Sequence, residues 1–187
     1  LYGDATHRVG ASRLTILLET LEELGDQPVI IWANFHEEIE QISTALGDQA
    51  VTLYAKTKDR AASLVAFGTT AQYLIAHPRS AGHGLTLTQS ATAIWYSLDW
   101  SLEAYSQAND RIHRIGQTRS CLYVHLIGKS PAGGDLIDEH IWGVLQQKRT
   151  LQDAIDAALG GRSSQQPFHV VETPTHTSDA ASFTNAL

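Results

Sequence analysis

The sequence predicts an α/β fold with a parallel sheet and helices on both of its faces. Short, continuous apolar runs recur along the 187 residues, segments with apolar residues at helical spacing lie between them, and glycines follow several of those segments. A strand that is buried on both faces has a continuous apolar sequence, and an alternation of such strands with helices is typical of βαβ units. The length is enough for one domain with a sizeable core.

The amino-terminal part of the chain opens with a helix. Leucines at helical spacing predict this helix over residues 12–24, and Gly25 is expected to end it. The run PVIIWA predicts a buried strand over residues 28–33. Isoleucines on one face predict an amphipathic helix over residues 36–46, and AVTLY predicts a second strand over residues 50–54.

The central part of the chain continues the alternation. KDRAASLVAF predicts a helix over residues 58–67, and two apolar runs predict strands over residues 71–77 and 92–97. A helix is expected over residues 102–115 because apolar residues recur there every three or four positions. The run SCLYVHLIG predicts a further strand over residues 120–128.

The composition changes near residue 159. One long helix, or two helices, is expected over residues 135–159, and the chain that follows is rich in Ser, Thr, Gln and Gly without helical spacing. We therefore expect one domain over residues 1–159 and a flexible tail over residues 160–187. Within that tail, the FHVV run at residues 168–171 is a candidate for a short docking strand.

Composition also limits the classes of function. The net charge of −7, from 13 Lys and Arg against 20 Asp and Glu, argues against strong DNA binding by this chain alone, because phosphate contacts need clustered cations. No apolar run is long enough to cross a membrane, and the single cysteine, Cys121, excludes an internal disulfide, so a reducing cytoplasm is expected. The sequence contains no methionine, so we expect a piece of a longer protein.

Two short motifs favour structural interpretations over functional ones. Residues 128–130, GKS, lack the earlier glycine that a phosphate-binding loop needs, because Tyr123 stands in its place. Residues 138–140, DEH, resemble a magnesium-binding acidic box, but they fall at the start of a helix and not at the end of a strand. With one cysteine and no H-x-x-x-H pair, we expect no metal site in the chain.

The segment QANDRIHRIGQ, residues 107–117, is the strongest functional signal. On a helix, Gln107, Arg111 and Arg114 fall on one face at spacings of four and three. Two arginines one turn apart repel each other by roughly a few tenths of a kcal/mol, and a polyphosphate would offset that repulsion by binding both guanidinium groups. Surface arginines paired with acids are the alternative interpretation. A second face is expected to be buried in the core, and its residues are Ala104, Ala108, Ile112 and Ile115.

The same segment resembles the last conserved motif of Swi/Snf-type ATPases, Q-A-x-x-R-x-H-R-x-G-Q. Other elements that resemble this family come in the family's order: VIIWANF at residues 29–35, HPRSAGHGLTL at residues 77–87, the pair Asp99-Trp100, and LIDE at residues 136–139. The resemblance covers roughly residues 10–155. It implies the C-terminal RecA-like lobe of a superfamily-two, DNA-dependent ATPase, and the wording H-P-x-S-A-G-H-G-L is similar to the bacterial and phage branch.

The resemblance also implies roles for single residues. Arg111 and Arg114 would be arginine fingers that reach the γ-phosphate of ATP, which an N-terminal RecA-like lobe of the same protein would hold with Mg²⁺. Gln107 would help to orient the nucleotide. Gly82 and Gly84 would let the backbone approach the nucleotide and the DNA closely, and the alternative for these glycines is a tight turn with positive φ.

Further residues are implied as contacts to DNA. His77, Ser80 and Thr86 would contact DNA phosphates, although Thr86 stands where the family usually has Asn. Trp100 would couple the nucleotide-facing helix to the DNA-facing loop. The simpler alternatives are a capping role for His77 and Ser80, and a place in the core for Trp100.

The sequence has neither a Walker-type lysine loop nor a strand-terminal acidic box, so we expect no ATP hydrolysis by this chain alone. In the whole protein, the resemblance implies a translocase on double-stranded DNA, encoded by a bacterium or a phage and located in the cytoplasm. Two alternatives stay open. One is a lobe of a strand-separating DNA or RNA helicase, and the other is a non-catalytic RecA-like module that binds other proteins.

Overall fold

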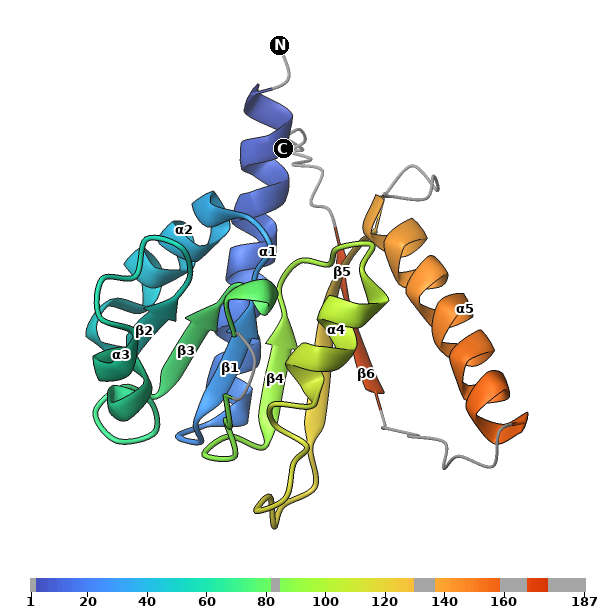
Figure 1. Cartoon of the computed structure of the whole chain (residues 1–187). Coiled ribbons are helices and arrows are strands. Elements are labelled where there is room, and N and C mark those ends of the chain that lie inside the picture. The colour runs from blue at the N-terminus through green and yellow to red at the C-terminus, as the bar shows by residue number, and fades with distance from the viewer. Residues whose placement is uncertain (1–2, 82–84, 130–136, 159–167, 175–187) are drawn as a thin grey trace, which may run out of the picture.

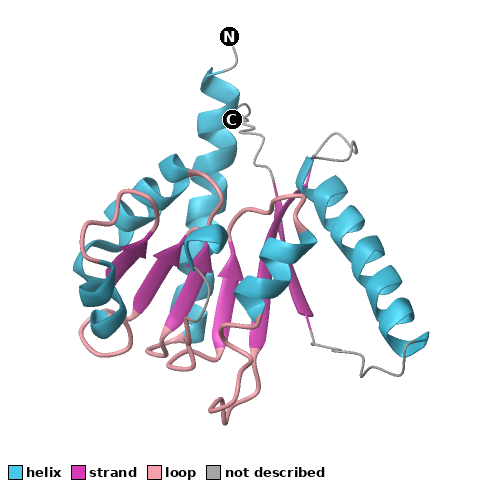
Figure 2. Ribbon diagram, viewed as in Figure 1, coloured by secondary structure: helices cyan, strands magenta, loops and turns pink. Residues whose placement is uncertain are grey.

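The computed structural model describes residues 3–81, 85–129, 137–158 and 168–174. A six-stranded sheet with the strand order β2-β3-β1-β4-β5-β6 forms its centre (Figure 1). Every neighbouring pair of strands runs parallel. Helices lie on both faces of the sheet (Figure 2), which confirms the predicted α/β fold class.

The strands that the sequence predicted are all present, and the predicted helix over residues 36–46 has the bounds of α2. The helices and strands, in chain order, are α1 (Gly3–Leu24), β1 (Val29–Trp32), α2 (His36–Leu46), η1 (Gly47–Gln49), β2 (Ala50–Leu53), α3 (Arg60–Ala66), β3 (Tyr73–Ala76), η2 (Pro78–Ala81), β4 (Thr92–Trp95), α4 (Leu102–Asn109), β5 (Leu122–Lys129), α5 (Ile137–Ala158) and β6 (Phe168–Pro174).

Strand β1 shows why the sheet carries a layer of helices on each face. Successive side chains of a strand point to opposite faces. Val29 and Ile31 belong to the core that α1 and α2 cover, and Ile30 and Trp32 belong to the core that α3, α4 and α5 cover. All four residues are fully buried, and burial of such a side chain stabilises the fold by about 1.5–3 kcal/mol.

Because the strands run parallel, their carboxyl ends meet at one edge of the sheet, which we call the carboxyl edge. The opposite edge, where the strands begin, is the amino edge. Helices α3 and α4 start soon after strands end at the carboxyl edge, and each start is capped. The side chain of Asp59 accepts a hydrogen bond of 2.8 Å from the backbone N–H of Ala62, and that of Ser101 accepts one of 3.2 Å from Ala104.

Helix α4 ends earlier than the sequence predicted. The pattern predicted a helix over residues 102–115, but α4 ends at Asn109, which is buried. The indole N–H of Trp95 donates to the Asn109 side chain over 3.1 Å, and the Tyr123 hydroxyl donates to the Asn109 carbonyl over 3.2 Å. These hydrogen bonds fix Asn109 against strands β4 and β5, and after it the chain continues in turns.

The predicted core face of this segment is therefore only partly right. Ala108 and Ile112 are buried as predicted, but Ile115 is 100% exposed. The helical spacing that placed Ile115 on the core face does not continue past Asn109. The residues from Asp110 to Gly116 instead lie in turns on the way to the amino end of β5.

A strand lies within the part of the chain that was predicted as a tail. Residues 168–174 form β6, which pairs in parallel with β5 from Tyr123↔Phe168 to Lys129↔Pro174. Without this strand, β5 would form an edge of the sheet with unpaired backbone groups, and an apolar, β-branched run can pair with such an edge. The FHVV run was the part of the tail singled out as a docking strand. The division of the chain at residue 159 stays a prediction.

Candidate functional site at two edges of the sheet

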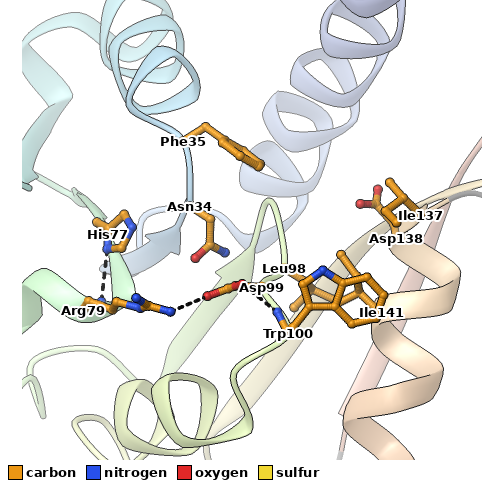
Figure 3. Close-up of a pocket in the computed structure, with 10 residues that line it drawn as sticks. All are labelled: Asn34, Phe35, His77, Arg79, Leu98, Asp99, Trp100, Ile137, Asp138 and Ile141. Carbon is orange, nitrogen blue, oxygen red and sulfur yellow. Dashed lines mark hydrogen bonds and ion pairs between the residues drawn. The ribbon is translucent and has the colours of Figure 1, made fainter.

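A cavity of about 420 Å³ lies at the carboxyl edge, lined by the side chains labelled in Figure 3. They come from the loops after β1, β3 and β4 and from the first two turns of α5. Open parallel sheets bind ligands outside the carboxyl ends of their strands. Of the predicted site residues, His77 and Trp100 line this cavity.

His77 is held in one orientation by its own loop. Its Nδ1 accepts a hydrogen bond of 3.1 Å from the backbone N–H of Arg79, and its ring lies edge-on to that of His36 with 6.5 Å between the centroids. Burial lowers the pKa of His77, and the nearby His36 and Arg79 lower it further. In a neutral ring whose Nδ1 accepts, Nε2 carries the proton and can donate it to an anion.

Ser80 lies in the same short helix, η2, as the residue after Arg79. Its backbone N–H donates to the carbonyl of His77 over 2.8 Å, and its own carbonyl accepts a hydrogen bond from the Arg60 guanidinium of α3. The structure thus brings together His77 and Ser80, the first two of the three predicted DNA contacts. These bonds also fit the capping alternative, so the role in DNA binding stays a prediction.

Arg79 is a site residue that the sequence interpretation missed. Its Nη2 donates to Oδ2 of Asp99 over 2.9 Å, and Oδ1 of Asp99 accepts the backbone N–H of Trp100 over 2.7 Å. The sequence did contain an indication of its role, because Arg79 is the one Lys or Arg in the segment of residues 77–87 that resembles a family motif. Its partner is 20 positions away, which no local pattern shows.

Trp100 is a surface residue of the cavity and not part of the core. The residue is 41% exposed, and its ring lies edge-on to that of His140 of α5 with 5.5 Å between the centroids. The Lys148 ammonium donates to the Trp100 carbonyl over 2.9 Å. The core alternative for Trp100 is therefore wrong, and the residue links the carboxyl edge to α5.

The arginines of the strongest motif lie at the amino edge, because α4 leads the chain from the carboxyl end of β4 back toward the amino end of β5 (Figure 1). The backbone N–H of Leu87 donates to the carbonyl of Arg111 over 2.9 Å. Nη1 of Arg114 donates to the Leu85 carbonyl over 3.2 Å and to the Thr86 hydroxyl over 3.3 Å. Thr86, which was predicted as a DNA contact together with His77 and Ser80, therefore lies beside Arg114.

The turn that carries the arginines is anchored to the segment before β4. The Gln117 side chain donates to the Ser90 carbonyl over 2.7 Å, and the Arg119 guanidinium donates to the Gln89 carbonyl over 2.7 Å. Within the described parts of the chain, neither Arg111 nor Arg114 forms an ion pair with a carboxylate. The alternative of surface arginines paired with acids finds no support there.

Gln107 does not share a helical face with these arginines, because α4 ends before them. Its side chain is exposed and donates to Glu103, one turn earlier in α4, over 2.9 Å. The predicted nucleotide contacts Gly82 and Gly84 lie outside the described residues.

Within the described ranges, no three His, Cys, Asp or Glu side chains gather closely enough to hold a metal ion. Among the helices described, none has the length and apolar sequence needed to traverse a bilayer.

Comparison with known proteins assigns the domain. Residues 12–116 match the family described as the helicase conserved C-terminal domain. The chain is 39% identical over 77 residues to the chromatin-remodeling ATPase INO80 of Mycosarcoma maydis, and 43% identical over 81 residues to the helicase ssl-1 of Caenorhabditis elegans. These matches cover 41% and 43% of this chain but only 4% and 3% of the relatives, so the chain spans a small fraction of their length.

A solved structure shows the same fold. The crystal structure of the C-terminal part of the Fun30 ATPase domain is similar with a TM-score of 0.59 and 23% sequence identity, covering 80% of this chain and 53% of that chain. This likeness confirms the RecA-like form of the sheet. The relatives named above are eukaryotic, so the expected bacterial or phage branch, and with it a bacterial or phage origin, finds no support. The similarity to these relatives supports the predicted Swi/Snf-type lobe. This chain, matched over more than half of its 187 residues, belongs to the helicase conserved C-terminal domain family.

Proposed function

We propose that this chain is the C-terminal motor lobe of an ATPase that translocates on double-stranded DNA, and that Arg111 and Arg114 act on ATP held by an N-terminal RecA-like lobe. The proposal rests mainly on one observation. The two arginines lie in a turn that backbone contacts hold in place, and within the described residues no carboxylate neutralises either of them. A guanidinium group stays charged at all relevant pH values and binds phosphate oxygens with two parallel hydrogen bonds.

In this proposal, Arg111 and Arg114 stabilise the negative charge that develops on the phosphate oxygens during transfer. An arginine in this role increases the rate by about 10³–10⁵-fold. Thr86 would hold the Arg114 guanidinium in position through the hydrogen bond between them, and Gln107, Gly82 and Gly84 keep their proposed roles near the nucleotide. Bound Mg²⁺ would neutralise phosphate charge, and we place its ligands on the N-terminal lobe because the described residues do not fit a metal.

At the carboxyl edge, His77 and Ser80 would contact the DNA backbone through the Nε2–H and the hydroxyl group. Arg79 would add a cation to the same surface. Trp100 would carry the effect of DNA binding toward α5, because its ring and its carbonyl contact that helix. The relatives named as a chromatin-remodeling ATPase and as a helicase support this kind of activity.

The test is ATP hydrolysis with and without duplex DNA, first by this chain alone and then by a protein in which it follows its N-terminal lobe. We expect no turnover by the chain alone and DNA-stimulated turnover by the longer protein. Arg114→Ala should abolish turnover while ATP still binds. The matched control is Lys56→Ala, which removes an exposed cation that pairs with Glu40 and does not hold the turn of the two arginines.

Three outcomes would favour another function. Turnover by the chain alone would contradict the assignment of ATP binding to a separate lobe. Normal turnover of the Arg114→Ala protein would contradict the arginine fingers and favour a module that binds other proteins. Displacement of one strand from a duplex, or stimulation by RNA instead of DNA, would favour a strand-separating helicase.

A further inference from the structure

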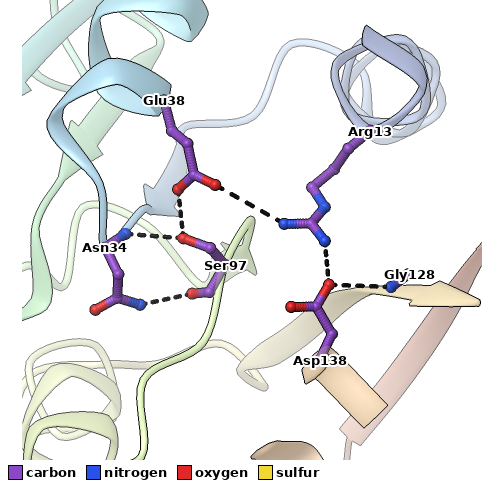
Figure 4. A network of polar contacts seen from close by, with 6 residues as sticks. All are labelled: Arg13, Asn34, Glu38, Ser97, Gly128 and Asp138. Atoms are coloured by element: carbon purple, nitrogen blue, oxygen red, sulfur yellow. Dashed lines mark hydrogen bonds and ion pairs between the residues drawn. The ribbon is translucent and has the colours of Figure 1, made fainter. Parts of the chain in front are cut away.

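Arg13 of α1 lies between two carboxylates at the carboxyl edge (Figure 4). Its Nη2 donates to the carboxylate of Asp138, and its Nη1 lies 3.8 Å from Oε1 of Glu38. The Arg13 side chain is only 12% exposed, and the guanidinium lies over the ring of Tyr96, 5.6 Å from its centroid. The three charged groups come from α1, α2 and α5, which are far apart in the sequence.

The Glu38 side of this network leads to one wall of the cavity. The hydroxyl of Ser97 donates to Oε2 of Glu38 over 2.5 Å. Asn34 donates to Ser97 twice, from its backbone N–H to the hydroxyl over 2.9 Å and from its side-chain amide to the carbonyl over 2.8 Å. Asn34 follows β1 and lines the cavity, so Glu38 fixes this wall through Ser97.

The Asp138 side leads to the opposite wall. Asp138 lies in the first turn of α5 and lines the cavity itself. Its Oδ2 also accepts a hydrogen bond of 3.3 Å from the backbone N–H of Gly128, near the end of β5. One carboxylate thus holds both the end of a strand and the start of a helix, and Arg13 holds that carboxylate.

The charges make Arg13 difficult to replace. One guanidinium group offsets two carboxylates in a place that is largely closed to water, and burial raises the pKa of Glu38 even though Ser97 and Arg13 favour its charged form. Without Arg13, two like charges would remain and would repel each other across the cavity wall. The planar guanidinium can serve two carboxylates at once, whereas a lysine ammonium acts as a single point charge.

We infer that Arg13 is a positioning residue that sets the separation between the Asn34 wall and the Asp138 wall of the carboxyl-edge cavity. The inference rests on the proposed function, because it takes this cavity to face DNA. Arg13 itself does not line the cavity, so it acts only through Glu38 and Asp138. No part of the sequence pattern marks it, since Asp138 is 125 positions away.

The test uses the protein that contains this chain and its N-terminal lobe, with two readouts. The first is hydrogen exchange at the backbone amides of Asn34 and Gly128, which report one wall each. The second is the concentration of duplex DNA that gives half-maximal stimulation of ATP hydrolysis. Arg13→Met should increase both exchange rates by roughly tenfold or more and raise the DNA concentration needed by roughly fivefold or more, while the KM for ATP and unstimulated turnover stay unchanged.

Two further variants separate positioning from a general loss of stability. The double variant Arg13→Met with Glu38→Gln lacks one of the two like charges, and the amide of Gln can still accept from Ser97. The exchange rates and the DNA concentration for half-maximal stimulation should therefore return most of the way to their wild-type values. Arg149→Met is the matched control, because Arg149 is also largely buried and pairs with Asp153 of α5 at 3.9 Å, but does not line the cavity. It should lower the melting temperature without changing either readout.

The outcomes are distinguishable from those of the proposed function. Unchanged exchange at Asn34 and Gly128 in Arg13→Met, or equal changes in Arg149→Met, would overturn the inference. A wild-type protein that DNA does not stimulate would overturn the proposed function. The exchange rates would in that case still decide whether Arg13 holds the two walls together. If Arg13→Met fails to fold, Arg13→Lys allows the same comparison. Because one ammonium group acts as a single point charge, we expect a smaller increase in exchange at one wall than at the other.

Discussion

The guanidinium of Arg79 donates a 2.9 Å hydrogen bond to the carboxylate of Asp99 in the lining of the carboxyl-edge cavity. The side chains are 66% and 36% exposed, so the pair contributes little to stability, at most about 1 kcal/mol. It does place a negative charge where the proposed DNA phosphate would bind. In the DNA-free chain, Asp99 therefore competes with phosphate for Arg79.

Asp99→Asn should strengthen DNA binding. The amide oxygen can still accept from the Trp100 backbone, while the charge that competes with phosphate is lost. We expect the DNA concentration for half-maximal ATPase stimulation to fall by roughly two- to fivefold at low salt, the scale of an exposed ion pair. Glu103→Gln changes the net charge equally but lies outside the cavity lining. If Glu103→Gln lowered this DNA concentration by the same factor, the stronger DNA binding would come from net charge alone.

A second prediction concerns the salt dependence of DNA binding. If Arg79 contacts one phosphate, Arg79→Ala should reduce the slope of log K against log salt concentration by about 0.9, the value for one lost phosphate contact. The measurement is fluorescence anisotropy of labelled duplex DNA across a range of salt concentrations. Arg119→Ala, at the other edge of the sheet, should leave the slope as it is. A weaker affinity with an unchanged slope would show that Arg79 does not meet a phosphate.

The success of the fold prediction has a simple physical reason. A strand buried on both faces needs a continuous apolar run, so β1, β3 and β4 are visible in the sequence alone, and all their residues are buried. The end of α4 is not visible in this way. It depends on contacts of Asn109 with Trp95 and Tyr123, each 14 positions away, and a local pattern contains no information about them.

The same distinction applies to the candidate site. The motif around Arg111 and Arg114 is local, so its resemblance to a family could be seen in the sequence. Arg13 and Arg79 are defined by partners at positions 138 and 99, and only the fold brings these groups together. Thr86 was assigned to DNA by its place in a motif. The structure shows that the loop turns it toward Arg114.

Asn109 yields a prediction about stability and turnover together. Asn109→Ala removes the acceptor of the buried Trp95 indole N–H, and an unsatisfied buried donor costs about 1–3 kcal/mol. Urea unfolding should show a loss of that size. Turnover of the longer protein should also fall, because the turn that carries Arg111 starts at this residue.

Tyr123→Phe is the matched variant for Asn109. It removes the hydroxyl, which donates to the Asn109 carbonyl and also contacts the Cys121 thiol, so we expect a smaller loss of roughly 0.5–1.5 kcal/mol and nearly normal turnover. The Asn109 carbonyl keeps backbone partners in Ile112 and His113. If Asn109→Ala were as stable as the wild type, another group would have to satisfy the Trp95 indole, and the explanation for the end of α4 would fail.

The last prediction is the effect of His77 on stability as the pH changes. Burial, and after it the neighbouring His36 and Arg79, hold the pKa of His77 below its ordinary value of 6.5 in the folded chain. Below pH 6.5 the unfolded chain therefore binds more protons at this position than the folded chain does. Protonation then favours unfolding, so the contribution of His77 to the free energy of unfolding is present above pH 6.5 and is lost as the pH falls toward the folded-state pKa.

This effect can be measured by urea unfolding at pH 7.5 and pH 5.5. The free energy of unfolding should fall between these values in the wild type, and His77→Gln should reduce that fall, because Gln does not titrate. His113→Gln, which changes an exposed residue of the turn after α4, is the control for the loss of an imidazole elsewhere in the chain. A His77→Gln chain with the full pH dependence would mean that the proton binds to His77 equally in both states. The ring would then be solvated like a free imidazole and not held by its loop against His36.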